Sequence, residues 1–209
     1  MKGPNVLRFA RLAQNLIRHP GYVRRYWRCA PCHGKQPIDH ELPWYSFGAI
    51  DYLENHITQD MVVFEYGGGG STLFFARRAK QVLCTESDPG WAEKIKNGLA
   101  ARRLTNVRMM VHPFDPRNEA AFMESAYYKS VSGVTADVFV IDGYEAEIPL
   151  RPHCFWEAEK WVKPGGVIIL DDSWRYERIR RNNKAKASLV FQSVGPCRYG
   201  VTSTDVFLY

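Results

Sequence analysis

The 209-residue sequence has no apolar stretch long enough to cross a bilayer, and its N-terminus lacks the uninterrupted apolar region of a secretory signal peptide. These two absences predict a cytoplasmic protein. Cysteine is scarce: the chain has five, an odd number, so a framework of paired disulfides is not expected. With 45% hydrophobic residues, the chain is large enough for one domain with its own core.

A second cysteine pair is also missing. Cys29, Cys32 and His33 have the spacing of covalent haem attachment, but that modification requires export. No second Cys-x-x-Cys supplies the remaining ligands of a zinc site, and a redox dithiol is expected at a strand–helix junction, not in a basic leader. The sequence therefore assigns no cofactor to these cysteines.

The net charge of +6 is unevenly distributed, because eight lysines and arginines precede the first acid, Asp39. Residues 1–41 are predicted to be a basic helical extension, in which the chain breaks at residues 19–21. Two interpretations stay open: the apolar stripe of its first helix packs against the domain, or the helix attaches to an anionic membrane surface or an acidic partner. The stripe consists of Val6, Ala10, Ala13, Leu16 and Ile17.

Residues 61–72 are the most informative stretch. Residues 61–64 are apolar and predict a buried parallel strand, which ends on Glu65. Four glycines follow at 67–70 and allow a ligand to approach the main chain closely. Ser71 is predicted to cap the next helix, whose unpaired N–H groups then face the ligand. A strand, a glycine turn and a helix in this order predict a nucleotide pocket.

The acids around this turn indicate the kind of nucleotide. The dinucleotide fingerprint requires a third glycine where this chain has Thr72, and the Glu65 carboxylate would repel a pyrophosphate but suits a positive group. About twenty residues later a second predicted strand, 81–85, ends on Glu86, which can accept hydrogen bonds from both ribose hydroxyls. Asp88 is predicted only to cap the following helix.

Residues 64–72 resemble the first motif of class I S-adenosylmethionine-dependent methyltransferases, whose cofactor carries a sulfonium and an ammonium. The opening Leu42-Pro43-Trp44 is similar to that of a poorly characterised subgroup found near polysaccharide-related genes, and it implies that Trp44 and Tyr45 contact cofactor or acceptor unless they are core. By this resemblance the cofactor-binding residues are Glu65, Gly67, Gly68, Gly69, Ser71, Thr72, Glu86, Asp115 and Asp142.

Strands alternate with helices over residues 42–209, which predicts an α/β domain with a doubly wound, mostly parallel seven-stranded sheet and helices on both faces. The last two strands, 187–191 and 204–209, have no helix between them and predict an antiparallel hairpin, as in the family resembled. Ligands bind at the carboxyl edge of such sheets. Five acids are expected to meet there: Glu65, Glu86, Asp142, Asp171 and Asp172.

Methyl transfer to oxygen also needs the acceptor proton removed, and we expect Asp142 to be the catalytic carboxylate. Asp142, Asp171 and Asp172 resemble the metal acids of catechol-type O-methyltransferases, so a divalent metal is a possibility, although none is expected. Position alone suggests four acceptor contacts, and an arginine among them would suit a uronic acid or a phosphorylated sugar. The four are Tyr144, Arg151, Arg175 and Tyr176.

The sequence thus predicts an S-adenosylmethionine-dependent methyltransferase acting on a small-molecule or glycan acceptor, at oxygen. Residues 142–144 do not match the Asn/Asp-Pro-Pro-aromatic motif of enzymes that methylate nucleic-acid amino groups, so a nucleic-acid acceptor is disfavoured. The alternative is a catalytically silent protein of the same fold that binds a partner or an anionic surface through its basic helix. Such a protein has no physical need for carboxylates at three strand ends.

Overall fold

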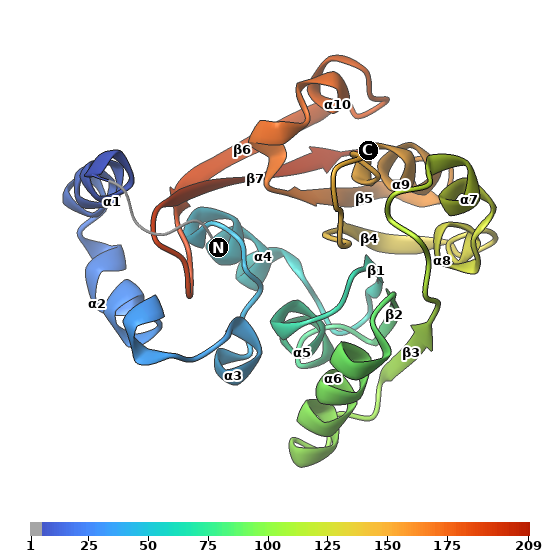
Figure 1. Cartoon of the computed structure of the whole chain (residues 1–209), viewed down its shortest axis with the longest axis horizontal. Coiled ribbons are helices and arrows are strands. Elements are labelled where there is room, and N and C mark those ends of the chain that lie inside the picture. Colours follow the sequence, from blue (N-terminus) through green and yellow to red (C-terminus); the bar gives the residue numbers. More distant parts are fainter. Residues whose placement is uncertain (1–5) are drawn as a thin grey trace.

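Seven strands form one sheet in the computed structural model, which describes residues 6–209 (Figure 1). The sheet order is β3-β2-β1-β4-β5-β7-β6; neighbours among the first five strands are parallel, and β7 is antiparallel to both β5 and β6. The predicted mostly parallel sheet with a C-terminal antiparallel hairpin is confirmed. The strands are β1 Val62–Tyr66, β2 Gln81–Glu86, β3 Val107–Val111, β4 Ala136–Ile141, β5 Val162–Asp171, β6 Ala187–Val194 and β7 Val201–Leu208.

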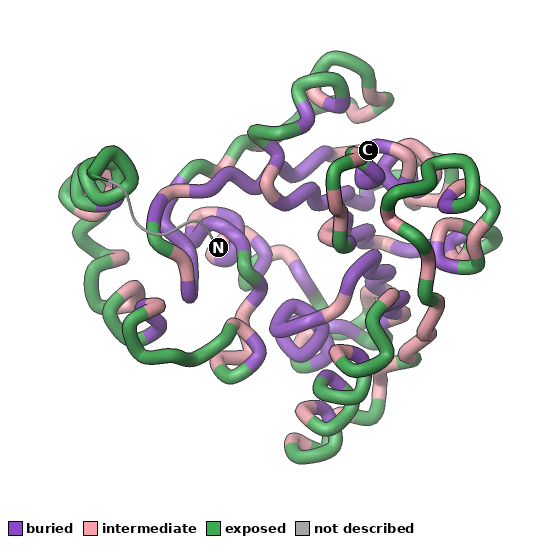
Figure 2. The backbone as a smooth tube through the Cα atoms, viewed as in Figure 1, coloured by how far each residue is buried: buried purple, intermediate pink, exposed green. Residues whose placement is uncertain are grey.

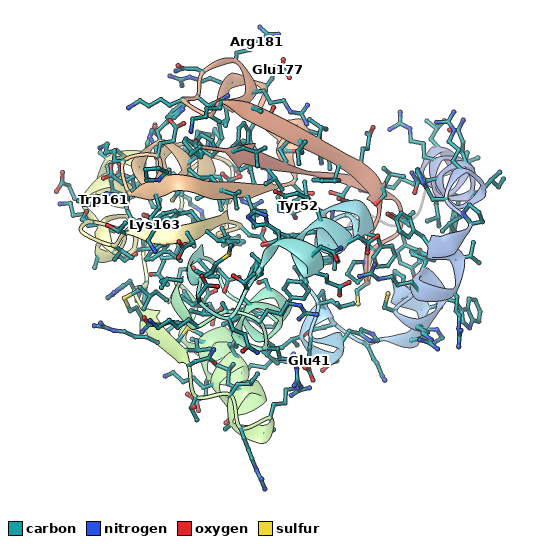
Figure 3. All side chains as sticks on the ribbon, turned by 180° about the vertical axis from the view of Figure 1, so that it is seen from behind. Glu41, Tyr52, Trp161, Lys163, Glu177 and Arg181 are labelled. Carbon is teal, nitrogen blue, oxygen red and sulfur yellow. The ribbon has the colours of Figure 1, made fainter. Side chains whose placement is uncertain are left out.

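Strand β5 begins five residues earlier than the apolar run at 167–170 suggested. Val162 pairs with Ala136, and an irregularity in the register precedes the pairing of Val167 with Val138. Lys163 lies in this early part and forms an ion pair of 2.8 Å with Asp137 (Figure 3). The sequence did not reveal this extension because Pro164 and two glycines are typical of a turn.

Alternate residues of the central strands enter two separate apolar clusters. Val138 and Val140 of β4 belong to the first cluster, whereas Phe139 and Ile141 belong to the second. This period of two is that of a strand whose two faces are both buried. The first cluster includes α4 Phe47–His56, α5 Gly70–Ala76 and α6 Pro89–Ala101; the second includes α7 Glu119–Glu124, α8 Ala126–Lys129, α9 Arg151–Ala158 and α10 Glu177–Arg181.

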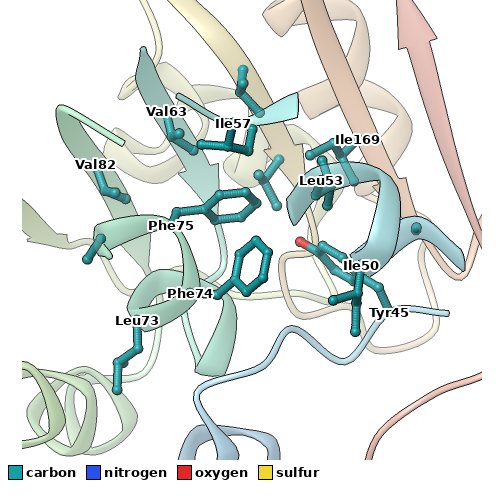
Figure 4. Packing of buried hydrophobic residues seen from close by; sticks show 14 of the residues in the cluster. Tyr45, Ile50, Leu53, Ile57, Val63, Leu73, Phe74, Phe75, Val82 and Ile169 are labelled. Carbon is teal, nitrogen blue, oxygen red and sulfur yellow. The ribbon is translucent and has the colours of Figure 1, made fainter. Parts of the chain in front are cut away.

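Helices α4 and α5 make the centre of the first cluster (Figure 4). Phe74 and Phe75 of α5 lie between the strands and α4, which contributes Ile50 and Leu53. Helix α4 begins where predicted, because the Ser46 hydroxyl accepts a hydrogen bond from the Ala49 N–H group. This packing holds the start of α5, and with it the glycine turn, against the sheet.

The N-terminal segments contain four short helices: α1 Val6–Arg18, α2 Gly21–Arg28, the 3₁₀ helix η1 Pro31–His33 and α3 Pro37–His40. Helix α1 is exposed over most of its surface (Figure 2), and only Leu12 is buried in it. The packing interpretation of its apolar stripe is wrong for four members, since Val6, Ala10, Ala13 and Ile17 are exposed; only Leu16 contacts the core. Within residues 6–209, no helix combines the length and apolar content needed to span a membrane.

Candidate functional site

The glycine turn after β1 is held by contacts that exclude side chains. Gly67 has a φ of +83°, and a Cβ there would lie 2.6 Å from the Gly143 Cα atom, because the ends of β1 and β4 touch. A Cβ on Gly70 would lie 2.2 Å from the Leu42 carbonyl oxygen. The segment before α4 therefore packs directly on the turn.

Thr72 organises the turn from inside the helix. Its hydroxyl accepts a hydrogen bond of 3.0 Å from the Gly69 N–H group and donates one of 2.6 Å to Glu65 Oε2. The predicted capping role of Ser71 is wrong, because α5 begins at Gly70 and it is the Thr72 hydroxyl that accepts from the N–H group of Gly69, the residue before the helix. The threonine that breaks the dinucleotide fingerprint is the residue that stabilises this turn.

Glu65 is a fully buried acid at the end of β1. Its Oε2 atom accepts from Thr72, whereas Oε1 has no hydrogen-bond partner among residues 6–209. Burial raises the pKa of Glu65 to about 7, even though the hydroxyls of Ser71 and Thr72 oppose the shift. An ionised carboxylate in this position requires a positive partner.

Glu86 ends β2 and faces the same turn. Its Oε1 atom accepts from the N–H groups of Ser87 and Asp88, and its Oε2 atom accepts from the Gly68 N–H group at 2.9 Å. A carboxylate oxygen has two lone pairs, so Oε2 can accept a second hydrogen bond. The predicted cap Asp88 accepts from the Trp91 N–H group, as expected.

A pocket of about 930 Å³ opens at the ends of β4 and β5; none of its lining residues belongs to the glycine turn, but Asp142 lines it and the adjoining Gly143 abuts Gly67. Its floor contains Asp142, Asp171 and Asp172, and Arg151 lies beside them. The walls come from α1, from Trp44, from Trp174 after β5, and from the loop between β6 and β7. The tertiary structure therefore builds the second half of the site from both ends of the chain.

Arg151 ties the floor of the pocket together. Its guanidinium is buried, donates to the Gly143 and Asp171 carbonyl oxygens at 2.9 and 3.0 Å, and lies 3.0 Å from Asp142 Oδ1. Burial raises the pKa of Asp142, with Arg151 opposing the rise. One positive charge therefore holds the ends of β4 and β5 and keeps Asp142 next to the pocket.

Arg198 has the corresponding role for the acid pair at the end of β5. It lies 3.2 Å from Asp172 Oδ1 and 3.8 Å from Asp171 Oδ2. Burial alone would raise the pKa of Asp172, but Arg198 and the Thr202 hydroxyl hold it below its usual value. Burial and the nearby charge of Asp142 raise the pKa of Asp171. No group of three potential ligands among the described residues is arranged to hold a metal ion.

Tyr45 lies between the two halves. It is fully buried, and the negative charges of Asp142 and Glu65 add to burial in raising its pKa. Its hydroxyl has no partner among residues 6–209. Tyr45 is thus a core residue with a polar end near both acids, whereas its neighbour Trp44 is 37% exposed and lines the pocket.

Of the four predicted acceptor contacts, only Arg151 lines the pocket. Tyr144 is exposed, while Arg175 pairs with Glu145 at 3.2 Å and Tyr176 donates to the same carboxylate. Asp115, the predicted adenine contact, is exposed and accepts a hydrogen bond from the Arg117 N–H group.

Position along the chain did not reveal the pocket residues contributed by α1 and the hairpin loop. One signal was available: the polar residues of α1 recur at intervals of three and four and therefore share one helix face. Nothing comparable marks the loop, because its position depends on how β6 and β7 pair. The residues concerned are Arg8, Arg11, Asn15 and Arg18 of α1 and Arg198 and Tyr199 of the loop.

No protein-family model and no curated protein matches the sequence. Solved structures do resemble the fold. A candidate O-methyltransferase from Klebsiella pneumoniae aligns over 97% of this chain and 99% of its own, with 19% identity and a TM-score of 0.59. The O-methyltransferase TomG from Streptomyces achromogenes, solved with S-adenosylmethionine, aligns over 83% and 90%, with 18% identity and a TM-score of 0.59.

A candidate methyltransferase from Streptococcus mutans, solved with S-adenosylhomocysteine, aligns over 84% of this chain and 99% of its own, with 12% identity and a TM-score of 0.55. At such identities the likeness concerns the fold. The chain has the fold of S-adenosylmethionine-dependent methyltransferases, as the order of its strands and the hairpin at its C-terminus also indicate.

Proposed function

We propose that this protein is an S-adenosylmethionine-dependent methyltransferase that methylates an oxygen of a small-molecule or glycan acceptor. One observation carries the proposal: two buried carboxylates with unused acceptor positions, Glu65 and Glu86, lie at the glycine turn, and Asp142, at the strand end that abuts this turn, lines a large pocket with acids in its floor. This arrangement pairs a site for a cationic nucleoside with a separate site for an acceptor.

The residues of the turn fit this cofactor. The Glu65 carboxylate, whose Oε1 atom lacks a partner, would pair with the ammonium group, and Glu86 Oε2 would accept from a ribose hydroxyl. When bound, the cofactor supplies an activated methyl group that the acceptor displaces in line. The roles predicted for Gly67, Gly68, Gly69, Ser71, Thr72 and Asp115 remain predictions.

Asp142 is the proposed catalytic base. Its side chain is 20% exposed, lines the pocket and lies at the strand end nearest the glycine turn. A carboxyl whose pKa is raised by burial takes a proton from an acceptor hydroxyl more effectively near neutral pH. Arg151 stabilises the ionised form and fixes its position.

A glycan acceptor is supported by the aromatic walls of the pocket. Trp44, Trp174 and Tyr199 are each at least one-third exposed and offer flat apolar surfaces with polar edges, which suit a sugar ring. The resemblance of the Leu42-Pro43-Trp44 segment to a subgroup near polysaccharide-related genes supports the same class.

The alternative of a catalytically silent protein accounts less well for Glu65. A buried carboxyl with an unpaired oxygen destabilises the folded state, and a purely structural position would be filled more stably by an apolar residue. Ligand binding gives this acid a reason to be present.

We also propose peripheral contact with an anionic membrane surface through the outward face of α1 and α2. Val6, Ile17, Val23 and Trp27 on this face are 49–84% exposed, and Arg24 and Arg28 lie exposed on the same segment. Exposed apolar side chains beside arginines are typical of helices that bind lipid interfaces.

The test of the enzyme proposal is calorimetric titration with S-adenosylhomocysteine. Wild-type protein should bind, and Glu86→Ala should bind at least about tenfold more weakly, since the charge-assisted hydrogen bond to a ribose hydroxyl is lost. Glu93→Ala, which removes an exposed acid from α6, should bind normally. Magnesium should leave the affinity unchanged. If the folded wild-type protein fails to bind, or if Glu86→Ala binds as well as wild type, the proposal is wrong.

The catalytic role of Asp142 has its own test. In Asp142→Asn, turnover should fall by about 100-fold or more while the affinity for S-adenosylhomocysteine changes little, because the amide cannot accept the acceptor's proton. The pH dependence of turnover on the acidic side should disappear in the variant. An unchanged pH profile would argue against Asp142 as the base.

A further inference from the structure

Helix α1 forms a wall of the acceptor pocket with its polar face. Arg8, Arg11, Asn15 and Arg18 line the pocket, while the apolar residues Val6 and Ile17 are 84% and 80% exposed. This orientation reverses the usual one, in which the apolar stripe of a surface helix faces the protein. The polar face of α1 is therefore presented to whatever enters the pocket.

The position of α1 is fixed by specific contacts. Leu12 is buried, and the Asn15 side chain accepts a hydrogen bond of 3.0 Å from the Val194 N–H group of β6. Phe9 meets Tyr199 of the hairpin loop edge to face, with ring centroids 6.4 Å apart. These three contacts fix the helix that carries the arginines of the pocket wall.

The charges within the pocket are not all balanced internally. Arg151 and Arg198 neutralise the acids of the floor. Arg11 and Arg18, in contrast, form no ion pair with any residue between 6 and 209. Their Cα atoms are separated by about 10 Å along the helix, as expected for two turns. Two unpaired guanidinium groups on one wall attract a negative charge, preferably an oxyanion that accepts two hydrogen bonds.

We propose that the acceptor is anionic, and that Arg11 and Arg18 of α1 bind its carboxylate or phosphate group while the hydroxyl to be methylated lies at Asp142. This inference rests on the proposed methyltransferase function and names its substrate class: an acidic or phosphorylated sugar. The positive wall orients such a molecule, because its charged group pairs with the arginines of α1 while its neutral hydroxyl can approach Asp142 on a floor whose acids are already paired with Arg151 and Arg198. Helix α1 is then a specificity-determining part of the site.

The test compares acceptors that differ only in charge. Binding is followed by tryptophan fluorescence, to which Trp44 and Trp174 of the pocket contribute, in the presence of S-adenosylhomocysteine. The probes are trigalacturonate against its neutral methyl ester, and glucose 6-phosphate against glucose. The first pair tests a carboxylate and the second a phosphate. We expect at least one anionic probe to bind about tenfold or more tightly than its neutral partner, and less tightly at high salt.

The variants separate the pocket charges from charge in general. The double variant Arg11→Gln/Arg18→Gln should bind the anionic probe about tenfold more weakly than wild type does. Arg24→Gln/Arg28→Gln removes the same charge from exposed positions on α2 outside the pocket and should change binding less than about twofold. Equal binding of acid and neutral partner in both pairs, or equal losses in the two double variants, would overturn the proposal.

Titration of every sample with S-adenosylhomocysteine distinguishes failure of the methyltransferase function from failure of the anionic acceptor alone. Its affinity should be the same in wild type and both double variants, because neither pair of arginines lies at the glycine turn. Failure of this titration in wild type would contradict the methyltransferase function. Normal cofactor binding with no preference for the anionic probes would overturn the anionic acceptor alone.

Discussion

The carboxyl edge of the sheet has two halves, the glycine turn and the pocket, and buried acids are stabilised by different partners in each. At the glycine turn, Glu65 and Glu86 are held by hydroxyl and backbone N–H groups from residues at most eighteen positions away. At the pocket, Asp142 and Asp172 are held by the charged guanidinium groups of Arg151 and Arg198. The first half is stabilised by hydrogen bonds from uncharged donors and the second by ion pairs with arginines.

This difference has a functional consequence. Hydrogen bonds to backbone groups fix a carboxylate without neutralising it, so the glycine turn keeps negative charge for a cationic ligand. Arginine partners neutralise the acids of the pocket floor and leave the unpaired charges of the opposite wall to select the acceptor. The cofactor half is therefore suited to one ligand, and the acceptor half can be changed by altering distant segments.

Replacing Arg151, whose guanidinium joins the ends of β4 and β5, should have the largest effect on stability. Arg151→Met leaves Asp142 without its ion pair and two carbonyl oxygens without donors, so the free energy of unfolding in urea should fall by about 3–5 kcal/mol. The matched control is Arg181→Met, which breaks an exposed pair with Glu177 on α10 and should cost less than about 1 kcal/mol (Figure 3). Equal losses would show that ion pairing does not hold the acceptor half.

Neutralising the buried acid of the turn should give the next largest effect, in the opposite direction. The pKa of Glu65 in the folded state, about 7, is above its ordinary value of 4.5, so the folded protein loses stability as pH rises from about 4.5 to 7. Glu65→Gln does not titrate and should be more stable than wild type at pH 8, by up to about 3 kcal/mol.

Thermal unfolding of Glu65→Gln and wild type between pH 4 and 8 would check the prediction, and the affinity of the variant for S-adenosylhomocysteine should fall by about tenfold. A wild-type stability that rises with pH over this interval would contradict the shifted pKa.

The hydroxyl that links the turn to Glu65 should have an intermediate effect. Thr72→Val leaves the Gly69 N–H group without its acceptor and removes the Thr72 hydrogen bond to Glu65 Oε2, which should cost about 2 kcal/mol of unfolding free energy. Thr105→Val, an exposed position before β3, should cost less than about 0.5 kcal/mol. If both variants unfold alike, the local hydrogen bonds are not what stabilises the cofactor half.

The smallest effect on stability is expected on the outward face of α1 and α2. Ile17→Ser/Trp27→Ser should change the unfolding free energy by less than about 0.5 kcal/mol per residue, because both side chains are exposed. Sedimentation with anionic phospholipid vesicles should nevertheless fall by about tenfold. Val190→Ser, which removes an exposed apolar residue from β6, is the control. Equal vesicle binding by all three proteins would exclude this face as the contact.

The sheet and the glycine turn could be predicted because their signals are local. The apolar runs of β1, β2 and β4 each end on an acid, and the order of strands, helices and final hairpin fits one known arrangement. The start of β5 and the cap of α5 were missed, since both depend on which backbone groups find partners after folding.

The sequence by itself determined the parallel sheet, the turn and the carboxylates at its strand ends, because hydrophobic periodicity and glycine geometry act over a few residues. Only the tertiary structure decided which face of α1 meets the pocket and that Arg198 pairs with the acids at the end of β5. It also decided that Tyr176 and Arg175 bind Glu145 and do not line the pocket. These choices follow from long-range packing, in which a side chain finds its partner through the positions of whole helices and strands.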